Sequence, residues 1–129
     1  MRALELPPRL RLIAGWVPEG AYLADVGTDH GYLPTWLRLQ GKIRGAVASD
    51  LRPGPLERAK VTGLLYGTDN IEYRLCNGLA GIRPSEVDTV TIAGMGGETI
   101  LSILKAAPWT ADGQHTLLPV SYTPLTLPT

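Results

Sequence analysis

Apolar residues along this chain gather in short runs whose spacing alternates between that of a strand and that of a helix. Residues 21–26 and 44–49 are compact runs of mostly apolar or small residues, which is typical of strands buried on both faces of a sheet. Residues 71–76 and 87–93 predict two more strands, the second of them rich in β-branched side chains. The chain therefore carries at least four candidate strands.

Segments with helical spacing precede and separate these strands, at 8–16, 32–40, 55–66 and 98–107. A leading helix followed by four βα units predicts an α/β fold with right-handed crossovers. We expect a Rossmann-like, partial doubly wound parallel sheet of about four to five strands. In such sheets ligands bind beyond the carboxyl ends of the strands, where the strand order reverses. Residues that follow each strand are therefore the first candidates for a site.

The last part of the chain departs from this pattern. Residues 113–129 contain no Asp, Glu, Lys or Arg and carry three prolines. Leu117, Leu118 and Val120 favour a fifth strand, but Pro119 is disfavoured in a central one. We therefore predict an incomplete domain over residues 1–118 and a tail over residues 119–129 that is disordered or not native sequence and adds nothing to the fold.

Composition limits the classes of function that remain. The chain has 129 residues, 44% hydrophobic and 19% charged, which fits one ordinary globular domain. No run is long enough to span a membrane, and prolines and arginines interrupt any secretory pattern within residues 7–11. A cytoplasmic location is expected. One cysteine, Cys76, excludes an internal disulfide, and with only His30 and His115 as histidines no metal site is predicted.

Charge is distributed unevenly, although the formal net charge is zero. Residues 1–60 hold nine Lys/Arg and six Asp/Glu, a net charge of +3, whereas residues 61–129 hold three and six, a net charge of −3. This asymmetry fits the steering of an anionic partner, but it fits an ordinary mixed surface equally well.

The turn after the first strand is the first candidate site, Asp25-Val-Gly27-Thr-Asp29-His30-Gly31. A glycine-rich strand-to-helix turn lets the backbone approach a ligand closely. A dinucleotide site would need glycine where Asp29 and Tyr32 stand. The pattern acid-x-Gly-x-Gly-x-Gly of S-adenosylmethionine sites loses only its middle glycine, and an aspartate there suits a cationic sulfonium. The pattern favours S-adenosylmethionine, with a purely structural turn as the alternative.

Three later segments follow the other strands. Asp50 ends the second strand, where a carboxylate can accept both hydrogen bonds of a ribose diol; the alternative is a cap for the next helix. Asn77 and Gly78 suit an adenine edge, or form a plain turn. Residues 94–97, Gly-Met-Gly-Gly, leave open backbone beside the cofactor, where a flat base can lie.

Four segments in order, LADVGTDHGYLP, ASDLRPGPLERAK, RLCNGLAGI and EVDTVTIAGMGGETI, strongly resemble the TrmK family, bacterial class I methyltransferases that modify N1 of adenine 22 in tRNA. The resemblance covers about residues 9–105. It implies S-adenosyl-L-methionine as cofactor and tRNA as partner. It implies that Asp29 and His30 face the reacting methyl group. It further implies a cofactor site made of Asp25, Gly27, Gly31, Asp50, Leu51, Asn77, Gly78, Ala93 and Gly94, with Gly94, Met95, Gly96 and Gly97 beside the target base.

The chain also departs from that family. The family continues into further strands and a C-terminal helical extension that helps to hold tRNA, and no match is seen here from about Pro119. We therefore expect this chain to bind tRNA more weakly than the family does. Two alternatives remain: a non-catalytic cofactor-binding fragment, and a methyltransferase that acts on another substrate.

Overall fold

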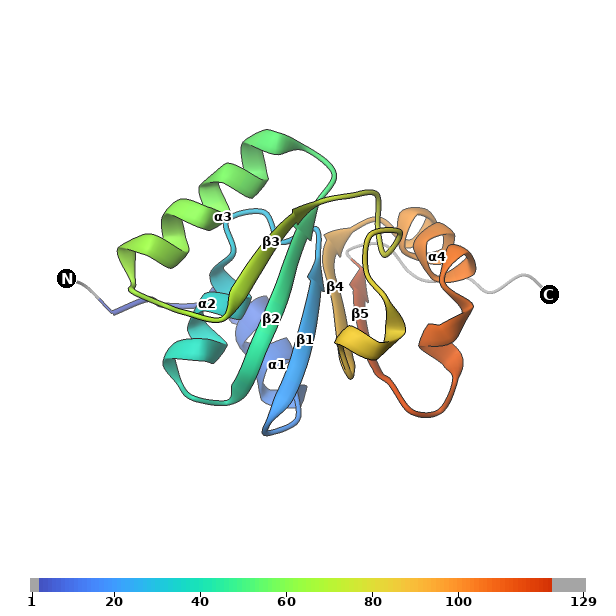
Figure 1. The fold of residues 1–129 in the computed structure, drawn as a ribbon, viewed down its shortest axis with the longest axis horizontal. Helices are drawn as coiled ribbons and strands as arrows, with labels where there is room; N and C mark the ends of the chain where they lie inside the picture. The colour runs from blue at the N-terminus through green and yellow to red at the C-terminus, as the bar shows by residue number, and fades with distance from the viewer. Residues whose placement is uncertain (1–2, 122–129) are drawn as a thin grey trace.

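The computed structural model describes residues 3–121 and contains one sheet of five parallel strands (Figure 1). The strand order is β3-β2-β1-β4-β5, so the chain first builds outward from β1 on one side and then returns to add β4 and β5 on the other. The strands are β1 (Ala21–Val26), β2 (Ile43–Asp50), β3 (Ile71–Leu75), β4 (Thr89–Met95) and β5 (Thr116–Ser121). The helices are α1 (Pro8–Trp16), α2 (Tyr32–Leu39), α3 (Pro53–Leu65) and α4 (Gly97–Ala106), with short 3-10 turns at Pro84–Glu86 and Pro108–Ala111.

Alternating side chains of the central strands supply two separate cores. Leu23 of β1 packs with buried residues of α1 and α2 on one face of the sheet. Its neighbours Ala24 and Val26 pack on the other face, with α4 and the segment that joins β3 to β4. This alternation follows from the pleat of a strand, and it covers both faces of β1. The central strand is consequently buried on both faces, and the carboxylates of Asp25 and Asp50 lie at the carboxyl edge of the sheet.

The predicted fold is confirmed, and every predicted helix and strand is present with ends that differ by no more than two residues. Helix α1 begins at Pro8, where a proline fits because the first amide of a helix needs no partner within it. Among residues 3–121, no helix is both long and apolar enough to cross a membrane. The same residues contain no group of three or more His, Cys, Asp or Glu that could hold a metal ion.

The prediction that residues from 119 onward lie outside the fold is wrong for residues 119–121. These residues belong to β5, in which Pro119 lies opposite Ile92 of β4. The described sheet ends at β5, and an edge strand can carry a proline because one side of its backbone needs no ladder partner. The tail predicted for residues 122–129 lies outside the described residues.

Candidate functional site

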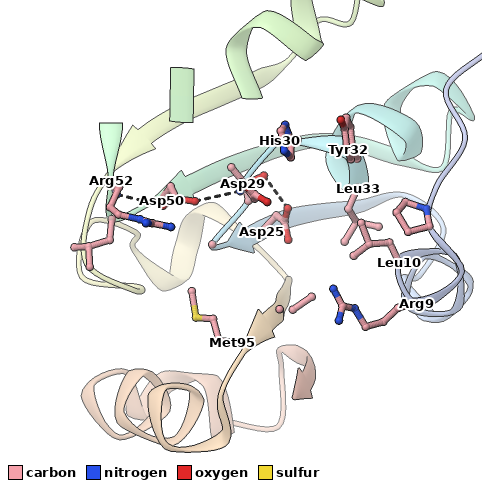
Figure 2. Close-up of a pocket in the computed structure, with 16 residues that line it drawn as sticks. Arg9, Leu10, Asp25, Asp29, His30, Tyr32, Leu33, Asp50, Arg52 and Met95 are labelled. Carbon is pink, nitrogen blue, oxygen red and sulfur yellow. Dashed lines mark hydrogen bonds between the residues drawn. The ribbon is translucent and has the colours of Figure 1, made fainter. Parts of the chain in front are cut away.

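A cavity of about 530 Å³ opens at the carboxyl ends of β1, β2 and β4, where the strand order reverses. This is the position at which doubly wound sheets bind ligands, and the volume suits a small organic molecule. Figure 2 shows the residues that line it. They are Pro7, Arg9, Leu10, Asp25, Gly27, Thr28, Asp29, His30, Tyr32, Leu33, Asp50, Leu51, Arg52, Ala93, Gly94 and Met95.

Asp25 is the most buried carboxylate of the cavity, with 4% of its surface exposed. Thr28 Oγ1 donates a hydrogen bond to Asp25 Oδ2, and Thr91 Oγ1 donates one to Oδ1, both at 2.8 Å. Burial raises the pKa of Asp25 to about 6; the two hydroxyl hydrogen bonds counteract this rise, and the nearby charge of Asp50 adds to it. At neutral pH the cavity wall therefore holds a poorly solvated negative charge, which a cationic ligand would stabilise.

The turn after β1 has the backbone conformation of a glycine-rich loop. Gly27 has φ +70°, and a Cβ there would lie 2.4 Å from the terminal methyl of Met95. Asp29, which stands where the methyltransferase pattern has its middle glycine, also has a positive φ of 54°. Aspartate tolerates the left-handed region better than most residues, so the substitution leaves the turn intact. The Asp29 side chain is 62% exposed and lies 3.7 Å from the guanidinium of Arg58.

Asp50 holds the turn from the neighbouring strand. Its Oδ2 accepts a hydrogen bond from the amide of Asp29 at 3.1 Å, and its Oδ1 accepts one from the amide of Arg52 at 3.2 Å. Arg52 is the N-cap of α3 and makes no side-chain capping hydrogen bond, so Asp50 acts on the start of that helix through the amide of Arg52. Each carboxylate oxygen has two lone pairs, so both can still accept a hydrogen bond from a ligand diol.

The loop after β4 forms the opposite wall. Gly94 has φ +78°, with open space where a side chain would be, and Ala93 and Met95 line the cavity beside it. Gly96 and Gly97 do not line it. They cap and begin α4, and Gly97 is buried there.

Three other residues that the resemblance implied also lie outside the lining. Gly31 has φ +69° and a Cβ there would lie 2.8 Å from that of Ala59, so its absence lets α2 approach α3. Gly78 lies against Ile103, whose nearest atom would be 3.0 Å from a Cβ. Asn77 is exposed. For the two glycines the structure shows a packing reason, and the predicted ligand contacts of all three stay predictions.

The structure adds seven lining residues that the sequence patterns did not indicate. Pro7, Arg9 and Leu10 come from the N-cap and first turn of α1, Tyr32 and Leu33 from the first turn of α2, and Thr28 and Arg52 from the two strand-to-helix turns. The ring of Tyr32 stacks on His30 with centroids 5.0 Å apart, which limits how His30 can turn. Arg52 could have been identified from the sequence, because it follows the end of the second strand by only two residues. The α1 residues were not, because they precede the sheet and follow no strand.

Comparisons with known proteins agree with this geometry. The family model described as "Methyltransferase domain" matches residues 6–123, a span that runs past Pro119. The chain is 40% identical over 119 residues to the curated tRNA (adenine(22)-N(1))-methyltransferase of Bacillus subtilis strain 168, covering 92% of this chain and 50% of that protein.

Solved structures give the same picture. The B. subtilis M1A22 tRNA methyltransferase TrmK superposes with a TM-score of 0.86 at 38% identity, covering 94% of this chain and 52% of that one. Streptococcus pneumoniae Sp1610, described as a putative tRNA (m1A22) methyltransferase in complex with S-adenosyl-L-methionine, gives 0.78 at 40% identity, covering 83% and 51%. The chain thus spans about half the length of the relatives it matches.

Proposed function

This chain belongs to the methyltransferase domain family, and from that premise we propose that it binds S-adenosyl-L-methionine in the cavity and transfers the methyl group to N1 of adenine 22 in tRNA. The observation that carries the proposal is the pairing of Asp25 and Asp50, one carboxylate at the end of each adjacent central strand, around a glycine turn. A dinucleotide would need glycine at Asp29 and Tyr32, and both side chains line the cavity instead.

The residues present fit the groups of this cofactor. Asp25 lies buried beside the turn, where a sulfonium and an α-ammonium would both offset its charge. Asp50 stands at the β2 end with acceptor capacity for the ribose hydroxyls. The open backbone at Gly94 leaves room for a planar ring, and we place the target base there, against Met95.

The protein has to contribute little covalent chemistry to the methyl transfer. The bound cofactor supplies a methyl group already activated by its sulfonium, so the chain mainly has to hold an in-line geometry. Adenine N1 attacks through a lone pair in the ring plane, and methylation leaves the ring cationic. We assign Asp29 to stabilising that charge, because its exposed carboxylate stands at the cavity beside His30.

Adenine N1 is hidden in a base pair, so the target base has to be unpaired or turned out of its stack before it reaches Gly94. The asymmetry of charge, with a net +3 over residues 1–60, suits an anionic RNA on the side that builds most of the cavity.

The test is binding followed by transfer. Calorimetry should detect S-adenosyl-L-methionine and S-adenosylhomocysteine but no comparable binding of NAD, and incubation with labelled cofactor and bulk bacterial tRNA should label the tRNA. Asp50→Ala serves as the matched variant, because it removes the diol acceptor and should reduce both signals together. Preferential binding of NAD would refute the proposal.

A second candidate is a cofactor-binding chain without tRNA methylation. The chain spans about half of its relatives' length, so cofactor binding and tRNA methylation are tested separately. This candidate would be selected if the chain binds the cofactor but transfers no label to tRNA, under conditions in which a full-length relative does label the tRNA.

A further inference from the structure

Arg9 contributes a cationic side chain to the lining of the cavity. It lies in the first turn of α1, is exposed, and lines the cavity together with Pro7 and Leu10. Within residues 3–121, no ion pair or side-chain hydrogen bond is recorded for its guanidinium. Figure 2 shows this group pointing from α1 toward the side of the cavity where Asp25 and Met95 lie.

The charges of the cavity wall are arranged at two ends. Asp50 and Arg52 lie together at the β2 end, where the amide of Arg52 donates to Asp50 Oδ1. Arg9 lies away from both in Figure 2, on the side of Asp25. A third arginine near the turn, Arg58, is 3.7 Å from Asp29 and does not line this cavity. Of the arginines that line the cavity, Arg9 is therefore the one at the Asp25 end.

The α-amino-acid end of a ligand carries a positive and a negative charge, and this cavity has a counter-charge for each of them near one end. Asp25 offers a negative charge and Arg9 a positive one, which together complement the ammonium and carboxylate of an α-amino acid. Asp50 offers acceptors for a diol at the other end. We propose that Arg9 binds the α-carboxylate of the cofactor's amino-acid portion and so sets its direction in the cavity, an inference that rests on the proposed function.

Helix α1 then becomes part of the cofactor site. Its core residues Ile13 and Ala14 are buried against the sheet, and this packing fixes where the first turn lies. Because Arg9 sits one turn before Ile13, its guanidinium is carried on a rigid element. A flexible N-terminal arm would hold it less well.

The rival anchors are Arg52, which would reverse the ligand, and backbone amides at the start of α2, which would make Arg9 dispensable. A pair of ligands separates these cases. S-adenosylhomocysteine carries the amino-acid portion, whereas 5′-methylthioadenosine retains the adenosine and the sulfur but lacks the carboxylate and the ammonium. A variant that loses affinity for S-adenosylhomocysteine but not for 5′-methylthioadenosine has therefore lost a contact with the amino-acid portion, and an arginine there can pair only with the carboxylate.

The experiment measures the Kd of both ligands by calorimetry for the wild-type chain and for Arg9→Gln, Arg52→Gln and Arg11→Gln. Arg11 is the matched control, an exposed arginine on the same helix that does not line the cavity. Arg9→Gln should weaken S-adenosylhomocysteine binding by about 10-fold, the lower end for a charged hydrogen bond because the guanidinium is exposed. Binding of 5′-methylthioadenosine should not change, Arg11→Gln should leave both Kd values unchanged, and Arg9→Lys should recover part of the loss.

Each other result would overturn the inference. Equal losses for both ligands in Arg9→Gln would show that Arg9 acts on the adenosine or on folding, and thermal melting would identify the second case. A selective loss in Arg52→Gln alone would place the carboxylate at the β2 end. No loss in either variant would assign it to backbone amides. Failure of the wild-type chain to bind S-adenosylhomocysteine would refute the proposed function itself, and with it the role of Arg9.

Discussion

Replacing Asp25 with Asn should make the ligand-free protein more stable at neutral pH and should weaken its hold on the cofactor. Asp25 is 4% exposed and its carboxylate faces two threonine hydroxyls. Burial is the main cause that raises its pKa from 3.8 to about 6. At about 1.4 kcal/mol per pKa unit, the ionised carboxylate costs the folded state up to roughly 3 kcal/mol above pH 6.

The sign of the pH dependence follows from this shift. Between pH 3.8 and about 6 the folded protein binds more protons at Asp25 than the unfolded chain does. The contribution of Asp25 to the free energy of unfolding therefore falls as pH rises through that window and stays constant above it. An asparagine does not titrate, so the variant lacks this fall. Its amide needs one threonine hydroxyl to turn and accept, at a cost of about 1 kcal/mol, which leaves a net gain of roughly 1–2 kcal/mol.

Urea unfolding of the wild-type chain and of Asp25→Asn at pH 4.5, 6 and 7.5 tests the reasoning. The gap in stability should open in favour of the variant as pH rises, while Glu98→Gln, an exposed carboxylate on α4, should show no such trend. In parallel, the wild-type Kd for S-adenosyl-L-methionine should decrease from pH 5 to pH 7, because the ionised Asp25 attracts the cationic cofactor. A variant that is less stable than the wild type at pH 7.5, with a gap that does not depend on pH, would refute the argument.

Three further predictions concern single side chains. Asp50→Ala should weaken cofactor binding by about 1.5–3 kcal/mol, measured by calorimetry, and a drop in melting temperature with unchanged Kd would contradict a ligand role. Asp29→Asn should slow the single-turnover methylation rate more than it raises the cofactor Kd, and an unchanged rate would remove Asp29 from the mechanism. Burial alone would lower the pKa of His115, but hydrogen bonds to Asp112 and the Pro84 carbonyl outweigh it and raise that pKa above its usual value. Only the imidazolium can donate to both acceptors, so this stabilisation is complete below the pKa of the unfolded chain and is lost as pH rises through the raised pKa. His115→Gln should therefore lower the free energy of unfolding in urea more at pH 6 than at pH 9. An equal loss at both pH values would contradict this prediction.

Sequence alone was sufficient for the four helices, for the first four strands and for the cavity residues at the ends of β1 and β2. Residues 87–93 predicted β4 because β-branched side chains suit a pleated, buried surface. Residues 21–26 predicted β1 because a short apolar run is typical of a strand buried on both faces. Once parallel strands are predicted, residues after them must meet at one edge, which is why Asp25, Gly27 and Asp50 could be identified as cavity residues.

Packing gave some residues a role that no local pattern contains. Gly31 and Gly78 fitted a ligand-binding motif, and their missing side chains also admit Ala59 and Ile103, contacts between segments far apart in the chain. Pro119 argued against a strand because a proline cannot donate to a central ladder. Its position at an edge of the described sheet depends on the strand order, which no local signal contains.

The contribution of α1 to the cavity was decided by tertiary structure alone. The sequence predicts a helix from Pro8, and in the structure its buried residues Ile13 and Ala14 pack on the sheet. Which end of that helix meets the carboxyl edge of β1 and β4 depends on its direction across the sheet, which is set by long-range packing of Ile13 and Ala14 against residues such as Leu23. That direction places Arg9 and Leu10 at the same cavity as Asp25, although they precede it by sixteen and fifteen residues in the chain.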